Sequence, residues 1–501
     1  MSLELKGITK RFGSLVANEL IDLKVSDGEI HAILGENGAG KSTLMNIVYG
    51  LIKADSGSIS IDGKIVEISD PSQALAAGIG MVHQHFMLVP VFTVVENIIL
   101  GNEKLKRGVL TVEEAKASIE RISKEFKFDI NPDELIENLP VGVQQKVEIL
   151  RALIYDAKVL ILDEPTAVLT PQETDELLSI MKSLKSRGAA IIFITHKLRE
   201  VQEVADKITV IRRGKVVGTT LPTATQEELA NLMVGRTVDL TANRESNKAG
   251  DTVLSINDLN IYDASGRVLV NNLSLDIKAG EVVAIAGVQG NGQSELVRAI
   301  INLEPHTSGS VKLNGKEILG NSVSKTLHQG VAYVPESREL DGLIGSFTIA
   351  ENLILDTHEN EPFSKYGQLS NSKVIENAEK LTKEFDIRSQ GVFDTASSLS
   401  GGNKQKVVLA RELSRDVKLV IASQPTRGLD VGSIEFVHER LLAERKSGRA
   451  ILLVSTELDE VTALADRIAV MYRGEILGIV SPDTSREKLG LMMAGIKERA
   501  S

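Results

Sequence analysis

Short runs of apolar residues, each ending at a turn, recur along the chain and predict buried strands. Examples are EIHAILG (29–35), AAIIFIT (189–195) and VVAIAG (282–287), whose length and β-branched content suit strands buried on both faces. Helical periodicity follows them: the segment 112–126 has the pattern of an amphipathic surface helix, and the segment 142–156 has a continuous apolar face. The residues of that face are Val143, Val147, Leu150 and Ile154. The alternation of strands and helices predicts an α/β fold.

The whole pattern occurs twice along the chain. SDGEIHAILGENGAGKSTL (26–44) matches KAGEVVAIAGVQGNGQSEL (278–296) at 252 positions further on. LILDEPTAVLT (160–170) matches VIASQPTRGLD (420–430) at 260 positions further on, so the order of the matches is kept and their offset hardly changes. Self-similarity of this kind indicates a duplication, and we predict two homologous domains.

The boundary between the copies is marked by the polar stretch TVDLTANRESNKAGDT. We therefore predict a first domain over residues 1–236, a linker over 237–252 and a second domain over 253–501. A chain of 501 residues is too long for one ordinary core, which agrees with this division.

Composition narrows the classes of function. The net charge of −11 disfavours nucleic acid as a partner, and the absence of cysteine excludes disulfides, thiolate metal sites and cysteine catalysis. The first residues lack the apolar core of a signal peptide, and no apolar run approaches the ~18 residues that span a bilayer. We expect a protein with no transmembrane segment of its own.

GENGAGKS (35–42) predicts a phosphate-binding loop, because it fits G-x-x-x-x-G-K-[ST] between a predicted strand and a predicted helix. Its glycines let backbone N–H groups point at phosphate oxygens, and the helix adds the positive end of its dipole. Lys41 would reach the β- and γ-phosphates of ATP, and the Ser42 hydroxyl would ligate Mg²⁺. An ordinary glycine-rich turn is the alternative. The predicted ATP-binding residues here are Gly35, Glu36, Asn37, Gly38, Ala39, Gly40, Lys41, Ser42 and Thr43.

Three polar residues follow two further predicted strands. VLILDEP (159–165) contains Asp163, which would hold Mg²⁺ through water, and Glu164, which would polarise the attacking water. His196 comes 33 residues after Asp163, at the end of the strand 189–195, from where it would reach the γ-phosphate. A surface turn is the alternative for the acidic pair, and a polar core or surface position is the alternative for His196.

With these residues in place, the chain resembles, twice over, the ATPase subunit of an ATP-binding-cassette (ABC) transporter. The resemblance implies that each half holds a RecA-like P-loop core, an antiparallel β part and a helical subdomain. Phe12 resembles the aromatic residue that stacks on adenine, with a core position as the alternative, and Gln84 resembles the glutamine that touches Mg²⁺ and senses the permease. LSGGN (399–403) resembles the family signature, which caps the γ-phosphate of a nucleotide held by the other cassette. Its predicted ATP-binding residues are Ser400, Gly401, Gly402 and Asn403.

The two halves keep complementary parts of the family's site. The first half keeps Lys41, Gln84, Asp163, Glu164 and His196, where the second half has Gln293, Glu336, Ser423, Gln424 and Glu457. The second half keeps the signature and Asp430, where the first half has Pro140, Val141 and Thr170. The degenerate second loop is formed by Gly287, Gly290, Gly292, Gln293 and Ser294.

In this family two cassettes pair head to tail, so each nucleotide lies between one half's loop and the other half's signature. The resemblance therefore implies one hydrolytic site, which combines Lys41, Asp163 and Glu164 with Ser400, and one non-hydrolytic site. The two cassettes of one chain are expected to form the functional pair. Whether the second loop binds a nucleotide is left open.

Fused pairs of this asymmetric kind resemble the ATPases of bacterial sugar and nucleoside importers. The stretches 80–101 and 139–150 look most like the nucleoside branch, and a simple-sugar importer of the ribose, galactose or xylose type is the alternative. The resemblance implies hydrolysis of ATP with Mg²⁺, coupled to two separate permease subunits fed by an extracytoplasmic solute-binding protein. Residues 84–139 and 337–398 would face the permeases, on the cytoplasmic side of the membrane.

Two other classes of protein are alternatives to the importer ATPase. Tandem cassettes that act on the ribosome or on DNA need a long charged linker or zinc-binding cysteines, and the short linker, the net charge of −11 and the absence of cysteine disfavour that class. A non-hydrolysing regulatory binder is disfavoured because Glu164 and His196 are intact. The transported solute is not specified by this chain.

Overall fold

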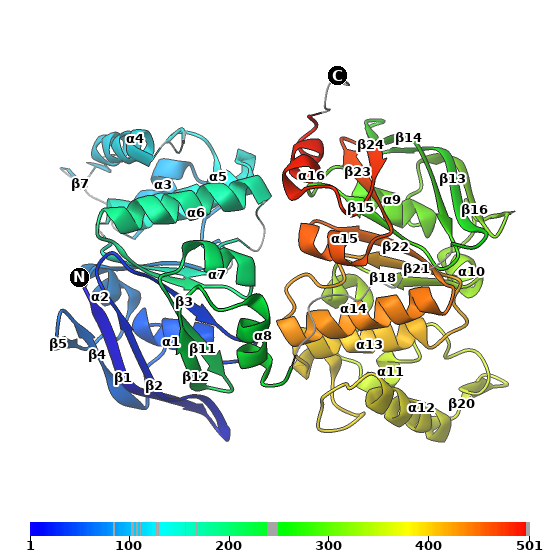
Figure 1. Ribbon diagram of the computed structural model, residues 1–501, viewed down its shortest axis with the longest axis horizontal. Coiled ribbons are helices and arrows are strands. Elements are labelled where there is room, and N and C mark those ends of the chain that lie inside the picture. Colours follow the sequence, from blue (N-terminus) through cyan, green and yellow to red (C-terminus); the bar gives the residue numbers. More distant parts are fainter. Residues whose placement is uncertain are drawn as a thin grey trace. The chain divides into compact units, whose positions relative to one another are not determined.

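The computed structural model describes residues 1–83, 86–101, 105–106, 109–110, 112–126, 128, 130–155, 157–166, 169, 171–237 and 249–496. The chain divides into two compact units, Met1–Val238 and Asp239–Ser501, which run from blue to green and from green to red in Figure 1. The division falls inside the predicted linker 237–252, of which residues 238–248 lie outside the described part.

Two sheets form the framework of the first unit. The four-stranded antiparallel sheet has the order β2-β1-β4-β5, and the six-stranded sheet has the order β12-β11-β3-β10-β9-β6. In the larger sheet the strands from β11 to β6 run parallel, and β12 is an antiparallel edge strand. The strands are β1 (Leu3–Phe12), β2 (Leu15–Val25), β3 (Ile30–Leu34), β4 (Ser56–Ile61), β5 (Lys64–Val66), β6 (Ile79–Val82), β9 (Val159–Asp163), β10 (Ala190–Ile194), β11 (Lys207–Arg212) and β12 (Lys215–Thr220).

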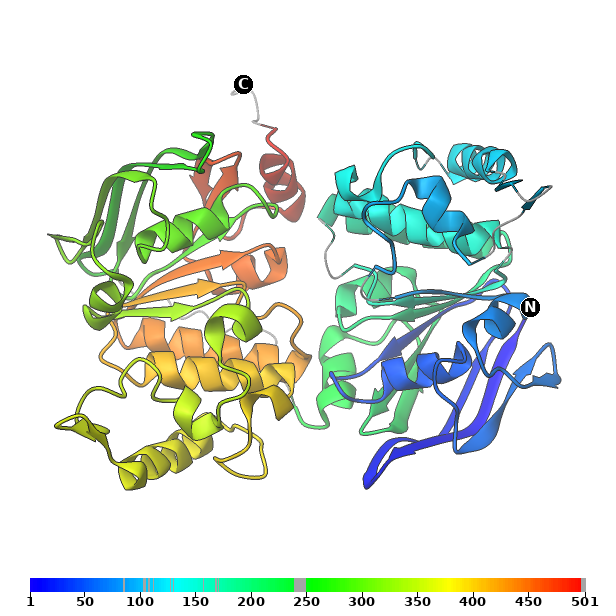
Figure 2. The same ribbon diagram turned by 180° about the vertical axis from the view of Figure 1, so that it is seen from behind.

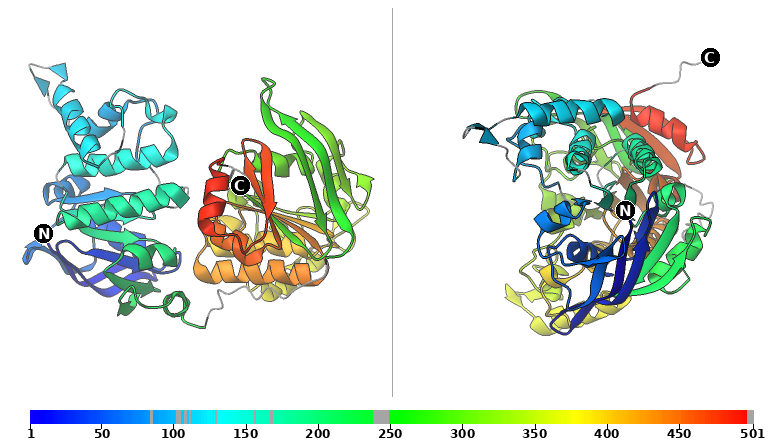
Figure 3. Two further views of the ribbon diagram at one scale, coloured as in Figure 1. Left: turned by 45° about the horizontal axis from the view of Figure 1, so that its top comes forward. Right: turned by 90° about the vertical axis from the view of Figure 1, so that its left-hand side faces the viewer.

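Helices cover both faces of the parallel sheet in this unit. The helices of this unit are α1 (Lys41–Val48), α2 (Pro71–Ala76), α3 (Val94–Ile99), α4 (Glu113–Phe126), α5 (Val141–Ile154), α6 (Pro171–Ser186), α7 (Leu198–Val204) and α8 (Gln226–Val234), and a short hairpin consists of β7 (Leu105–Lys106) and β8 (Val109–Leu110). Helices α6 and α7 lie in front of the sheet in Figure 1, and α1 is in front when the molecule is seen from behind in Figure 2. Figure 3 shows α4, in light blue, at the end of the unit away from β1 and β2.

The second unit repeats this architecture. Its antiparallel sheet has the order β14-β13-β16-β17, and its larger sheet has the order β18-β21-β22-β15-β23-β24. Its strands are β13 (Thr252–Tyr262), β14 (Val268–Lys278), β15 (Val282–Ala286), β16 (Thr307–Leu313), β17 (Lys316–Glu317), β18 (Val331–Val334), β19 (Ser364–Lys365), β20 (Gln368–Leu369), β21 (Leu419–Ser423), β22 (Ala450–Ser455), β23 (Arg467–Tyr472) and β24 (Glu475–Val480). Its helices are α9 (Gln293–Ile300), α10 (Val323–His328), α11 (Ile349–Asn352), α12 (Asn371–Glu384), α13 (Gly401–Leu413), α14 (Val431–Lys446), α15 (Leu458–Leu464) and α16 (Arg486–Met493).

Burial explains why these segments form strands. Every residue of β3, β9 and β10 is buried, as expected of parallel strands that are covered by helices on both faces. The prediction of an α/β fold with antiparallel and parallel parts in each half is confirmed. Because parallel strands end at the same edge of a sheet, the segments that follow β3, β9 and β10 are brought together there. Within the described residues, no helix is long and apolar enough to cross a membrane.

Candidate functional site

The phosphate loop of the first unit joins the end of β3 to the start of α1, and close backbone packing requires its glycines. A Cβ atom on Gly35 would lie 2.2 Å from the carbonyl oxygen of Ile211. Gly40 has a φ of 103°, and a Cβ atom there would lie 2.2 Å from the carbonyl oxygen of Ala17. The loop is held further by Asn18, whose Nδ2 donates to the Gly40 carbonyl oxygen over 3.0 Å. The backbone is therefore fixed in shape before any ligand binds.

Lys41 is the first residue of α1, and its side chain folds back over the loop. Its Nζ donates to the carbonyl oxygens of Gly35 at 2.7 Å and Glu36 at 3.0 Å, and the residue is only 5% exposed. The positive end of the α1 dipole and a positive ammonium group thus meet at one loop, which is the arrangement that favours a phosphate group.

Asp163, the last residue of β9, lies beside Ser42 and is 5% exposed. Burial raises the pKa of its carboxyl, and the hydrogen bond from Ser42 offsets only part of that rise. Within the described residues, its Oδ1 is buried without a hydrogen-bond partner. A buried carboxylate oxygen that lacks a donor, next to a hydroxyl group, fits a hard divalent cation such as Mg²⁺. The described residues contain no cluster of three or more acidic, histidine or cysteine side chains that would bind a metal alone.

Glu164 follows Asp163 with a φ of 47°, a conformation that turns its side chain out of the strand direction. Its backbone N–H donates to the carbonyl oxygen of Ile194 over 2.9 Å, and its Oε1 lies 3.3 Å from Nδ1 of His196. Burial by itself would raise the pKa of Glu164, but the hydrogen bond and charge of His196, together with the charges of Lys41 and Lys197, outweigh it and hold the pKa below its ordinary value. The result is a buried, ionised carboxylate, which suits a general base.

Phe12 and Gln84 are the two remaining predicted residues of the first unit. Phe12 ends β1 and is 48% exposed, so its ring is available at the surface and the core alternative is wrong. The ammonium of Lys10 lies 5.5 Å from its ring centre. Gln84 lies outside the described residues, directly after β6 and His83.

In the second unit the loop keeps its backbone shape and loses its charge. A Cβ atom on Gly287 would lie 2.7 Å from the carbonyl oxygen of Met471, and Gly292 has a φ of 102°, as at the matching positions of the first unit. Gln293 is 6% exposed, and its Nε2 donates to the Val288 carbonyl oxygen over 3.0 Å, in the manner of Lys41. An uncharged amide thus occupies the position of the ammonium group.

The positions that match the acidic pair are neutral in the second unit. Ser423 ends β21 and is buried where the first unit has Asp163. Gln424 has the same φ of 47° as Glu164, and its backbone N–H donates to the carbonyl oxygen of Val454 over 2.7 Å. Its Oε1 accepts from the N–H of Thr456 over 3.2 Å. An amide oxygen is a poor base, so Gln424 cannot activate water as a carboxylate at this position would.

The signature residues begin helix α13. Ser400 is the N-cap, and its Oγ accepts from Nδ2 of Asn403 over 3.0 Å and from the Asn403 backbone N–H over 3.4 Å. A Cβ atom on Gly402 would lie 2.1 Å from Oγ of Ser433, so α13 packs directly on the start of α14. At the matching place in the first unit, α5 has Pro140 as its N-cap with no side-chain cap bond. Of these two helix starts, only that of α13 has a serine N-cap.

Sequence patterns alone missed three residues that shape these sites. Asn18 braces the first loop, and Arg338 and Arg427 lie beside the second unit's functional segments, where Arg338 Nη1 donates to the Arg427 carbonyl oxygen over 3.0 Å. The sequence could have indicated Arg427, because the matching position of the first half has the neutral residue Ala167.

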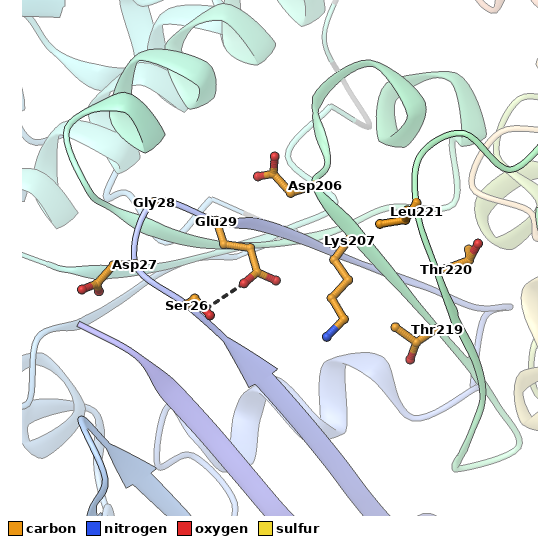
Figure 4. Close-up of a pocket in the computed structure, with 9 residues that line it drawn as sticks. All are labelled: Ser26, Asp27, Gly28, Glu29, Asp206, Lys207, Thr219, Thr220 and Leu221. Carbon is orange, nitrogen blue, oxygen red and sulfur yellow. Dashed lines mark hydrogen bonds between the residues drawn. The ribbon is translucent and has the colours of Figure 1, made fainter.

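A pocket of about 520 Å³ lies elsewhere in the first unit (Figure 4). It is lined by residues from the loop before β3 and from the start of β11, including Glu29, Asp206 and Lys207. The phosphate loop follows the opposite end of β3, so this pocket is separate from the site of Lys41.

The first unit combines a phosphate loop, a buried acidic pair and a histidine at one edge of a parallel sheet. The second unit repeats the arrangement with neutral residues in place of the lysine and the acidic pair. Together these features define an ATPase made of two cassettes. The ABC transporter family model matches residues 19–167 and 270–427. The chain belongs to the ABC transporter family, as the sequence motifs predicted, and it is an ATPase of that family.

Curated relatives align over almost the whole chain. It is 52% identical to the nucleoside import ATP-binding protein NupA of Lactococcus lactis subsp. cremoris, over 97% of each chain. It is 46% identical to the guanosine import ATP-binding protein NupO of Bacillus subtilis, over 99% of this chain and 98% of that one. It is 36% identical to the ribose import ATP-binding protein RbsA of Lactococcus lactis subsp. cremoris, over 99% of each chain.

Proposed function

We propose that this chain hydrolyses ATP to drive the uptake of nucleosides through separate membrane permease subunits. The observation that carries the proposal is the identity of 52% and 46%, over nearly the full length, to proteins named for nucleoside and guanosine import. Import of a simple sugar is the second candidate, favoured by the relative named for ribose import at 36% identity. The greater identity to the first two proteins places nucleosides before sugars.

In the proposed reaction, each group of the first unit has one task. The loop N–H groups and Lys41 bind the phosphates of ATP, and Ser42 and Asp163, together with Gln84, hold Mg²⁺. Mg²⁺, when bound, supplies positive charge that neutralises the phosphate oxygens. Glu164 orients and deprotonates the attacking water, while His196 keeps the Glu164 carboxylate ionised and in place. Phe12 stacks on the adenine ring.

The proposal further assigns the capping of this ATP to the second half. Ser400, Gly401, Gly402 and Asn403 would contact the γ-phosphate of the nucleotide held by Lys41, as the family resemblance implies. Helix α13 has a serine as its N-cap, whereas Pro140, the N-cap of the matching helix α5, makes no side-chain hydrogen bond. This difference supports the assignment of the capping role to the second half. The loop around Gln293 would form the non-hydrolytic site, since Ser423 and Gln424 are neutral.

The proposed partners are two transmembrane permease subunits and, through them, an extracytoplasmic solute-binding protein. Residues 84–139 and 337–398 would face the permeases. The chain would lie on the cytoplasmic face of the membrane, held there by these subunits. A direct test is membrane recovery: the protein should sediment with membranes only in cells that make the permease, and equal recovery without the permease would contradict this assignment.

The substrate is tested by uptake. Cells that lack this protein should lose uptake of labelled uridine, adenosine and guanosine and keep uptake of ribose. A plasmid copy of the wild type should restore uptake, and the matched Lys41→Ala copy should not. Loss of ribose uptake with normal nucleoside uptake would refute the nucleoside assignment and favour the sugar alternative.

A further inference from the structure

In the second unit, the Glu336 side chain accepts a hydrogen bond from the hydroxyl of Ser294, the residue that matches Ser42, which would ligate Mg²⁺ in the first unit. The Oγ of Ser294 donates to Oε2 of Glu336 over 3.2 Å, and Oε1 of Glu336 forms an ion pair with Arg427 at 2.5 Å. In the first unit, by contrast, Ser42 faces Asp163, whose Oδ1 is buried without a hydrogen-bond partner. The first site is thus open to a cation, whereas the carboxylate of the second already has a cation as its partner.

The ion pair is connected to the signature through the turn that contains Arg427. The backbone N–H of Arg427 donates to the Gln424 carbonyl oxygen over 3.1 Å, and the turn ends at Asp430, which caps α14 by accepting from the Ser433 N–H over 2.8 Å. Ser433 in turn packs against Gly402, where a Cβ atom would lie 2.1 Å from its Oγ. The start of α13 is thus connected to this turn through Ser433 and Asp430.

Arg338 makes a second connection between the same segments. Its Nη1 donates to the Arg427 carbonyl oxygen over 3.0 Å, and its Nη2 would lie 3.0 Å from a Cβ atom on Gly401. Glu336 and Arg338 are two residues apart, so one short segment contacts the phosphate loop, the turn and the signature. Contacts with fixed geometry at both ends are what a positioning role requires.

The first half lacks the charged residues of this network. At the positions that match Glu336, Arg338 and Arg427, it has the neutral residues Gln84, Phe86 and Ala167. An ion pair at these positions is therefore chemically impossible in the first half. The charged network belongs to the half that has lost the catalytic groups and kept the signature.

We propose that Glu336 and Arg427 are positioning residues. Their ion pair fixes the position of the signature Ser400–Asn403, both when the second loop holds a nucleotide and when it does not. In an intact cassette, Mg²⁺ and the γ-phosphate connect the loop serine to the neighbouring segments. Here the carboxylate and the guanidinium group make that connection permanently. The inference rests on the proposed function, in which this signature serves the ATP bound by Lys41.

The test uses the full chain assembled with its permease subunits. Glu336→Gln keeps the shape of the side chain and removes its charge, Arg427→Met removes the cation, and Arg427→Lys retains it. The matched control is Glu487→Gln, which removes one negative charge from an exposed residue of helix α16 in the same unit. The kcat for ATP hydrolysis, the Kd for ADP and the Tm are measured for each variant.

We expect Glu336→Gln and Arg427→Met to lower kcat by about tenfold or more, since misplacing a group by ~1 Å has effects of that order. The Kd for ADP should stay within about twofold, because ADP lacks the γ-phosphate that the signature caps. Arg427→Lys should keep at least about half of the wild-type kcat, and Glu487→Gln should equal the wild type. A lower kcat together with an unchanged Kd for ADP is the result expected of positioning residues.

Wild-type kcat in both Glu336→Gln and Arg427→Met would overturn the inference, as would an Arg427→Lys defect equal to that of Arg427→Met. If Arg427→Met has a low Tm and fails to bind ADP, Glu336→Gln alone decides. The proposed function fails in a different way: the wild type would then not hydrolyse ATP, or its hydrolysis would survive Lys41→Ala.

Discussion

The carboxylate of Glu164 lies 3.3 Å from Nδ1 of His196, although the two residues are 32 positions apart in the chain. The contact follows from the parallel pairing of β9 with β10, in which Asp163 lies opposite Ile194. Glu164 comes one residue after Asp163, and His196 two residues after Ile194, so both side chains leave the same edge of the sheet. This pair is the centre of the candidate catalytic site.

Glu164→Gln should nearly eliminate ATP hydrolysis while ATP still binds. The amide keeps the size of the side chain but cannot take a proton from water, and the loss of a general base typically costs about 10²–10⁴-fold. Steady-state ATPase activity and equilibrium ATP binding of the assembled transporter check this. The matching change in the second half, Gln424→Glu, should add no activity, because Gln293 and Ser423 still lack the charges that bind phosphate and Mg²⁺.

His196→Ala should move the acid limb of the pH–activity profile to higher pH. Burial raises the pKa of Glu164, and His196, Lys41 and Lys197 lower it. Removing the histidine takes away the first of these lowering effects, so the pKa rises and the base is protonated at a higher pH. The profile of the residual kcat is compared with that of the exposed-histidine variant His358→Ala, which should match the wild type. An unchanged acid limb in His196→Ala would show that Glu164 is not the titrating group.

Lys41→Ala should reduce hydrolysis nearly to background, and Gln293→Ala should barely change it. Lys41 is the ammonium group at the first loop, and it neutralises charge on the transferred phosphoryl group, for which a neutral side chain is no substitute. Both variants are measured by steady-state ATPase activity at saturating ATP. Substantial hydrolysis by the Lys41 variant would indicate that the second loop is active.

Ser400→Arg should stop hydrolysis as completely as Glu164→Gln, although Ser400 lies in the other half of the chain. The long side chain would intrude where the γ-phosphate is proposed to be capped. Pro140→Arg is the matched control in the first half, and its effect should be milder because its proposed partner loop lacks the catalytic acids. Near-normal ATPase activity in Ser400→Arg, or an equal defect in Pro140→Arg, would refute the pairing of the halves.

His31→Val should make the stability of the protein less dependent on pH. His31 is buried, with Nδ1 3.1 Å from Glu29 and Nε2 2.8 Å from Thr209 Oγ1. Burial lowers its pKa, the charge of Lys207 adds to that, and Glu29 only partly offsets it. The unfolded chain takes up this proton near pH 6.5. Stability is therefore fully present above about that pH and declines as the pH falls below it.

Thermal unfolding at about pH 7.5 and pH 5.5 checks this sign, since the interval spans the unfolded-state pKa. The wild type should lose more Tm between the two conditions than His31→Val. Valine is the residue of the second half at the matching position, Val283, so its size is tolerated on this strand. An equal loss of Tm in both proteins would contradict the assignment.

The sequence by itself determined the features that depend on neighbouring residues. The loop from Gly35 to Thr43 is one continuous segment, and its glycines and lysine must lie together because chain connectivity requires it. The buried strands were predictable from uninterrupted apolar runs, and the duplication was predictable from self-similarity. The family followed from these motifs and is confirmed by the match to both halves.

Only the tertiary structure decided which distant groups meet and which side chains are exposed. A β-branched run predicts a strand but not its neighbour, so the contact of Glu164 with His196 needed the register of β9 and β10. The exposure of Phe12 depended on its place at the end of an antiparallel strand. The ion pair of Glu336 with Arg427, 91 positions apart, depended on the folding of two loops toward one edge of the sheet. Such contacts are set by packing over the whole unit, which no local pattern encodes.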